Sequence, residues 1–223
     1  VSDRNRVLEL GLPLRPGTVP APIQRAISSR RPDGRYVAFD VEAAVRDPQD
    51  GSLWLGLEDE WHVVQADTVA GRARFVGVPE IRDWPRNGGA EAMARLPDGR
   101  WLMLCEACGT GRGGLHLGLL FAGHPGASKG HPFGFIVPPG FDPVDAAPLP
   151  DGRLLVLVRR FAFLPPHFEA RIVLADLAKL DLARPLATQE IARLDGRFLR
   201  ENWEGMMLVP EGKGHALWLT TDA

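Results

Sequence analysis

The chain has 223 residues, of which 26 are basic, 28 are acidic and 45% are hydrophobic. This length predicts one domain over residues 1–223. The formal net charge of −2 gives no reason to expect nucleic acid as a partner. No run approaches the ~18 apolar residues of a membrane span, so we expect no such span. We expect the protein to act as a monomer.

Short apolar runs alternate with turns along the chain, which contains 25 glycines and 20 prolines. This punctuation is typical of an all-β protein. Four segments share one pattern, in which an acid is followed by small or Met residues, a Pro-containing turn and a second apolar run. They begin at Val41, Ala90, Val144 and Trp203. Helix-forming residues are frequent in the first two, but the turn interrupts them within two helical turns, so we predict strands.

The acids of the four segments are 49, 54 and 59 residues apart. Two strands and a tight turn in each repeat favour a β-propeller with five or six four-stranded antiparallel blades. Another all-β sandwich or barrel is the alternative. The segment Leu174–Arg184, stopped by Pro185, could form one short helix.

Both ends of the chain match interior parts of the repeat. The opening Val-Ser-Asp resembles the end of a second strand, as at Leu55–Asp59 and Leu219–Ala223. An open ring would leave unpaired strand edges, which proteins avoid. We therefore expect that residues of the ring are missing at both ends, and a signal sequence could be among them.

Three glutamates occupy the same position in the repeat, six residues before the turn proline: Glu42, Glu91 and Glu204. In a propeller these positions would converge on the channel mouth, where carboxylates repel one another unless a cation compensates them. Oxygen ligands suit Ca²⁺ or Mg²⁺. Asn87 and Asn202 could add neutral oxygens. Alternatively, each acid only accepts hydrogen bonds from backbone N–H groups at a strand entrance.

Asp145 fits this pattern less well, because it lies five residues before its proline. Strand alternation would turn it to the other face unless a bulge restored the register. We count it as a weaker candidate ligand.

A second set of charged residues ends the following strands. Glu58, Glu106 and Arg159 each lie seven residues beyond a turn glycine, with Asp3 and Asp222 as counterparts. Arg159 and Arg171 could bind phosphate or carboxylate through two hydrogen bonds. The alternative for Arg159 is an ion pair with a glutamate of a neighbouring blade.

The remaining polar signals are weaker. Cys105 and Cys108 are too few for a zinc site, and redox chemistry, a local disulfide and two ordinary thiols stay open. His124 and His131 flank a Gly/Pro-rich loop, so we expect both to be exposed to solvent. No serine lies in a G-x-S-x-G motif, which excludes that form of serine-esterase site.

Four successive blocks of the chain resemble the phytase-like family, described as having esterase-like activity of phytase. They carry its Asn-x-Gly-x-Glu-Ala, Leu-Pro-Asp-Gly, Leu-x-Arg and Asn-x-Glu-Gly patterns. The blocks are "RNGGAEAMARLPDGRWLMLCE" at 86–106, "GFDPVDAAPLPDGRLLVLVRRF" at 140–161, "EARIVLADL" at 169–177 and "ENWEGMMLVPEGKGHALWLTTD" at 201–222. Two further motifs of the family are incomplete here. Its Asp-x-Glu-Gly motif reads Asp40-Val41-Glu42-Ala43, so Ala43 replaces the glycine, and the chain ends before the expected Ser-Asp-Asp-Asn is complete.

The resemblance implies an exported, periplasmic or secreted, β-propeller that hydrolyses a small phosphate ester or related ester. A Ca²⁺ ion would be held by the three glutamates, with Asn87, Asn202 and Asp145 as further ligands, and would activate water. Glu91 and Glu204 would take part in catalysis, while Arg159 or Arg171 stabilises the anion. The alternative is a non-catalytic propeller that binds a ligand or a protein partner at the channel mouth.

Overall fold

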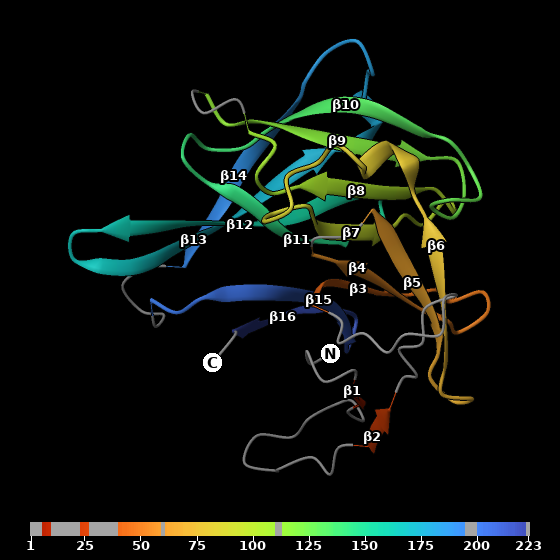
Figure 1. Ribbon diagram of the computed structural model, residues 1–223. Coiled ribbons are helices and arrows are strands. Elements are labelled where there is room, and N and C mark those ends of the chain that lie inside the picture. The colour runs from red at the N-terminus through yellow and green to blue at the C-terminus, as the bar shows by residue number, and fades with distance from the viewer. Residues whose placement is uncertain are drawn as a thin grey trace.

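The computed structural model describes residues 6–9, 23–26, 40–58, 61–109, 113–194 and 200–221. The described residues form strands with two single-turn 3-10 helices, which confirms the all-β class (Figure 1). Asp3 and Asp222, expected to belong to the second charged set, lie outside these residues. A two-stranded antiparallel sheet, β1 (Arg6–Glu9) and β2 (Ile23–Ala26), precedes the repeated part.

Three antiparallel four-stranded units follow in chain order. Their strands are β3 (Val41–Arg46), β4 (Leu53–Leu57), β5 (His62–Asp67) and β6 (Arg72–Gly77); β7 (Ala90–Arg95), β8 (Trp101–Cys105), β9 (Leu115–Phe121) and β10 (Gly130–Ile136); and β11 (Asp142–Pro148), β12 (Arg153–Phe163), β13 (Pro166–Asp176) and β14 (Leu186–Leu194). The antiparallel hairpin of β15 (Trp203–Glu211) and β16 (Gly214–Thr221) follows these units. A short parallel pairing of β10 with β14 joins the second and third units into one eight-stranded sheet.

The first strands of successive units lie side by side. β3 packs against β7, β7 against β11, and β11 against β15. In Figure 1 these four strands run near the middle of the molecule, and the later strands of each unit lie further out. The entrances of the four strands are thereby brought to one region.

A tight turn joins the first two strands of each unit. Its glycine has a left-handed φ of 72° at Gly51, 90° at Gly99 and 86° at Gly152, a conformation that residues with a Cβ adopt only with strain. The predicted acid-Gly turns are confirmed at these three positions.

Each first strand contains one extra residue near its start. The pairing register shifts between Val41 and Ala43, between Ala90 and Ala92, and between Trp203 and Gly205. The residues passed over are Glu42, Glu91 and Glu204, so the three glutamates occupy equivalent β-bulges. In β11 the shift falls between Pro143 and Asp145, so Val144 takes the equivalent position. Asp145 is therefore one residue out of step, as its distance from the turn proline predicted.

A separate hydrophobic cluster fills each contact between successive units. One cluster joins the first and second units around Trp54, Trp101 and Phe121. Another joins the second and third around Phe133, Phe135 and Val156, and Leu157 belongs to a third, between the third unit and the β15–β16 hairpin.

The helix considered at Leu174–Arg184 is reduced to one turn. β13 continues to Asp176, and only Leu177–Lys179 (η2) forms a 3-10 helix; the other such helix is Pro79–Ile81 (η1). Leu174 and Ala175 pair with β14 instead. Sheet pairing has overridden local helix propensity here.

Candidate functional site

Acidic side chains gather where the first strands begin. The carboxylates of Asp40, Glu42 and Glu58 offer oxygens that all lie within 4.8 Å of one another. The backbone N–H of Glu58, just after β4, donates to the Asp40 carbonyl at 3.0 Å, which holds the two segments together. Electrostatic repulsion extends from these residues to Glu91, Glu106 and Glu204. We call these six residues the acidic cluster.

The cluster shifts the protonation of its own members. Burial, followed by repulsion from Glu58 and Asp40, raises the pKa of Glu42 to about 7. Burial, followed by repulsion from Glu106 and Glu42, raises the pKa of Glu91 to about 9. The pKa of Glu106 is also raised, mainly by burial. Without a compensating cation, Glu91 therefore holds a proton at neutral pH.

Glu91 has an environment that is unusual for a buried acid. The residue is only 6% exposed, and its backbone N–H donates to the Gly89 carbonyl at 3.0 Å. Among the described residues its carboxylate has neither a hydrogen-bond donor nor an ion-pair partner. Its oxygens are not among the fully buried side-chain atoms without a hydrogen-bond partner in the described chain, which are Trp84 Nε1 and Arg95 Nε, so they reach solvent. The Glu91 carboxylate is therefore suited to an external cation or donor.

Arg159 supplies positive charge beside the cluster. Its guanidinium donates to Glu106 at 3.1 Å, to Glu204 and to the Asn202 side-chain oxygen at 2.5 Å. The Asn202 amide in turn donates to Glu204 at 2.5 Å. Of the two predictions for Arg159, the structure shows the ion pair with glutamates of neighbouring units. These hydrogen bonds fix the guanidinium at the cluster.

Two of the predicted ligands are placed differently from the bulge glutamates. Asp145 accepts backbone hydrogen bonds from Met206 at 2.6 Å and Ala146 at 2.7 Å, while desolvation raises its pKa to about 7. It thus acts as the backbone acceptor considered as the alternative for these acids. Asn87 is exposed before β7, and within the described chain no hydrogen bond joins it to the cluster.

Arg171 lies on the other face of its hairpin. Its guanidinium bonds Glu190 at 2.6 Å and lies 4.2 Å from the centre of the Phe141 ring. It pairs in register with Val158, which belongs to the core between the second and third units. The structure therefore does not bring Arg171 to Arg159 and the acidic cluster.

A polar cavity of about 370 Å³ adjoins the cluster. It is lined by β3, β11, β15 and β16, and its polar lining includes Asp40, Glu42, Asp145, Glu204 and Thr220. The cavity thus opens onto two of the bulge glutamates. It could hold a small ligand together with a cation.

The sequence reasoning left several site residues out of the predicted ligand set. Asp40 is the first residue of the Asp-x-Glu motif, and Glu58 and Glu106 were placed only in the second charged set. Asp142 pairs opposite Arg159, and burial raises its pKa. The repeat indicated Glu58 and Glu106 through their equal distance from a turn glycine. No feature of the repeat indicated Asp142.

The segment that carries Glu106 is closed by a disulfide between Cys105 and Cys108. This settles the three alternatives left open for these cysteines. Gly88, with φ of 90°, packs against the same segment, and a Cβ there would lie 2.6 Å from that of Ala107. The disulfide and the close glycine together hold Glu106 near Arg159.

Comparison with known proteins adds the family. The family model for phytase-like proteins, described as "Esterase-like activity of phytase", matches residues 1–223, the whole chain. The chain belongs to the phytase-like family. Searches among curated proteins and among solved structures returned no match. In the part of this phytase-like chain that the structure describes, no helix is long and apolar enough to cross a membrane.

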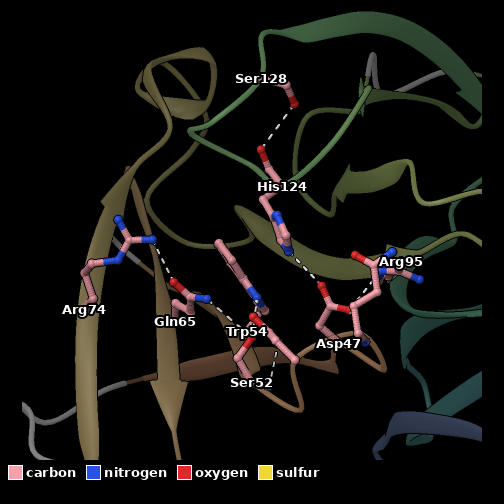
Figure 2. Close-up of polar contacts among 10 residues, drawn as sticks. Asp47, Ser52, Trp54, Gln65, Arg74, Arg95, His124 and Ser128 are labelled. Atoms are coloured by element: carbon pink, nitrogen blue, oxygen red, sulfur yellow. Dashed lines mark hydrogen bonds and ion pairs between the residues drawn. The ribbon is translucent and has the colours of Figure 1, made fainter.

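A second polar group of the phytase-like chain is centred on Asp47, directly after β3 (Figure 2). Asp47 is fully buried and bonds His124 Nε2 at 2.7 Å, with Arg95 Nε 3.1 Å away. Its Oδ1 also accepts the backbone N–H of Gln49 at 2.8 Å. It occupies the turn position that a leucine, Leu96, fills in the next unit, as their equivalent turn hydrogen bonds show.

His124 corrects one expectation. Its ring stacks on Trp54, with centroids 4.8 Å apart, and its side chain is only 33% exposed. The prediction that it faces solvent was wrong, because the Gly/Pro-rich loop folds back onto the first unit. His131 is exposed, as expected.

Proposed function

We propose that this phytase-like protein is a β-propeller that hydrolyses a small phosphate ester or related ester at the acidic cluster, with a bound Ca²⁺. The family match supports the esterase-like chemistry. The observation that carries the proposal is Glu91, a nearly buried residue whose carboxylate has no hydrogen-bond donor in the described chain, next to five further acids. A site built only from oxygen donors suits Ca²⁺ better than zinc.

The propeller arrangement is supported by the repeated units. Each described four-stranded unit has a first strand packed beside the next first strand, and a hydrophobic cluster lies between the units. Three complete units and one hairpin are described, and we propose a closed ring of five or six blades. The disulfide supports export to the periplasm or medium, because disulfides persist in oxidising compartments.

The residues present fit a calcium ion. Asp40, Glu42 and Glu58 would bind it, since their oxygens already lie within 4.8 Å of one another. The nearby carboxylate of Glu91 would compensate part of the positive charge of the ion. When bound, such an ion lowers the pKa of a coordinated water and polarises an ester oxygen. Arg159 would bind the substrate anion, and Glu106 and Asn202 would hold its guanidinium in place.

Calcium binding tests the first half of the proposal. We expect Ca²⁺ to raise the melting temperature of the wild-type chain relative to chelator, because a ligand that binds only the folded state stabilises it. Glu42→Gln and Glu91→Gln should remove most of that increase. Glu211→Gln, at the exposed end of β15, is the matched control. If Ca²⁺ leaves the wild-type melt unchanged, the metal site should be abandoned.

Hydrolysis tests the second half. We expect 4-nitrophenyl phosphate or 4-nitrophenyl acetate to be cleaved with Ca²⁺ present, and the two substrates distinguish a phosphate ester from a carboxylic ester. Arg159→Gln should raise KM for the phosphate at least tenfold, since each lost charged hydrogen bond weakens anion binding. Calcium binding without turnover of either substrate would favour a binding protein over an enzyme.

A further inference from the structure

The β12–β13 hairpin is longer than the equivalent hairpins. β12 and β13 have 11 residues each, whereas β4 and β8 have five. The β11 strand begins opposite Arg159, so residues 160–169 extend past the strand entrances. In Figure 1 the hairpin projects to the left beyond the neighbouring strands. We call residues 160–169 the arm.

One face of the arm is aromatic and continues directly from Arg159. Phe161 and Phe163 follow Arg159 at alternate positions of β12, and Phe168 pairs opposite Phe161. The Phe161 ring centroid lies 5.1 Å from each of the other two. The Arg159 guanidinium carbon lies 5.3 Å from the centre of the Phe168 ring. The charged site and the aromatic face are therefore contiguous.

The aromatic face is open to solvent, although its inner part is not. Leu157 lies on the same face further in and is buried in the cluster under β15 and β16. Beyond the strand entrances, Phe161 is 45% exposed and Phe163 is 76% exposed. Exposed aromatic rings beside a polar site are a common form of ligand-binding surface.

On the opposite side of the hairpin, Arg160 makes contacts that hold the base of the arm. Arg160 donates two hydrogen bonds to Glu169, at 2.7 and 3.0 Å, across the two strands. Its guanidinium carbon also lies 4.8 Å from the centre of the buried Phe141 ring. These contacts hold the base of the arm, where it leaves the sheet next to Arg159.

The charge of the site limits the substrate. Six carboxylates surround a single described arginine, so a bound cation must offset part of their charge before a phosphate can bind there. Each further phosphate on a substrate would add to the repulsion. The aromatic face would bury an apolar group favourably.

We propose that Phe161, Phe163 and Phe168 form a specificity subsite for the apolar alcohol part of a phosphate monoester whose phosphate binds at Arg159. The proposal rests on the proposed function for the position of the phosphate. The substrate is thus a phosphate monoester with a group about the size of one or two aromatic rings. The three phenylalanines position the substrate and take no part in the chemistry.

Binding of non-hydrolysable phosphonates tests this subsite without requiring turnover. Calorimetry on the full chain with Ca²⁺ compares (1-naphthylmethyl)phosphonate with (hydroxymethyl)phosphonate. We expect the naphthyl compound to bind at least tenfold more tightly. Phe161→Ala and Phe163→Ala should each reduce this preference to about threefold or less, with little effect on the small phosphonate. Ile191→Ala, which removes a comparably exposed apolar side chain on β14, should leave it unchanged.

Equal affinity for both phosphonates in the wild type, or a preference that survives both phenylalanine variants, would overturn the subsite. Failure of the proposed function appears separately, as an absence of hydrolysis of 4-nitrophenyl phosphate and acetate. If the protein prefers the naphthyl compound but cleaves neither ester, the subsite is supported and the proposed hydrolase activity is not. Because Phe161 and Phe163 are exposed, their substitution should leave the fold intact, which circular dichroism verifies.

Discussion

Asp47 and Glu91 are both buried residues, but only Asp47 has partners for its carboxylate within the described chain. Asp47, at the end of β3, is fully enclosed and meets His124, Arg95 and a backbone N–H. Glu91, at the bulge of β7, is almost as enclosed but meets no donor among the described residues. Burial raises the pKa of Glu91 to about 9. Asp47 is compensated from within the protein, whereas Glu91 is not.

The difference separates a structural charge from a functional one. Desolvating a charge is costly, and a buried ion pair is retained when its partners offset that cost. An uncompensated buried acid destabilises the fold, so its presence requires another reason, and binding sites are where such groups concentrate. We therefore interpret Asp47 as a clamp between the first two units and Glu91 as part of a site.

The largest effect should follow from breaking the clamp. Asp47→Leu introduces the residue type found at the equivalent turn position of the next units, Leu96 and Leu149. It nevertheless leaves the partly enclosed Arg95 without its carboxylate. We expect the free energy of unfolding, measured by urea denaturation, to fall by about 3–5 kcal/mol. Asp151→Asn, in an exposed turn, should change it by less than about 1 kcal/mol. If Asp47→Leu leaves the free energy of unfolding unchanged, burial of a leucine at this turn position stabilises the fold as much as the ion pair does.

A pH series with chelator should reveal the uncompensated acid. Because the pKa of Glu91 is about 9 in the folded protein and about 4.3 in an unfolded chain, the folded state keeps a proton that the unfolded state releases. Stability is then highest below the unfolded value and falls as pH rises towards 9. One such group contributes a slope of at most about 1.4 kcal/mol per pH unit. We expect Glu91→Gln to remove about 2 kcal/mol of the loss between pH 6 and pH 8.

Glu42 and Asp145, each with a pKa of about 7, act in the same direction. They remain in the variant, so only the difference between the two curves reports Glu91. Ca²⁺ should flatten the wild-type curve, and Glu211→Gln should follow the wild type throughout. Parallel curves for wild type and Glu91→Gln would mean that Glu91 is compensated in solution and that its contrast with Asp47 does not exist.

The equivalence of the three bulge glutamates was predictable because the distance to the turn proline encodes strand register. The same count correctly marked Asp145 as out of step. The side that Arg171 faces was not predictable, since it depends on pairing with Val158 on a strand whose register no local motif fixes. The environment of His124 was missed for a related reason, because Trp54 lies far away in the sequence.

The smallest effect should come from His124→Gln, which measures how much His124, rather than Arg95, compensates Asp47. Glutamine can still donate a hydrogen bond to Asp47 but cannot stack on Trp54. With Arg95 retained, we expect a loss of about 1 kcal/mol in the free energy of unfolding. His131→Gln, exposed at the start of β10, should have no measurable effect. A loss as large as that of Asp47→Leu would mean that His124 alone compensates the aspartate. In that case Arg95 would contribute little.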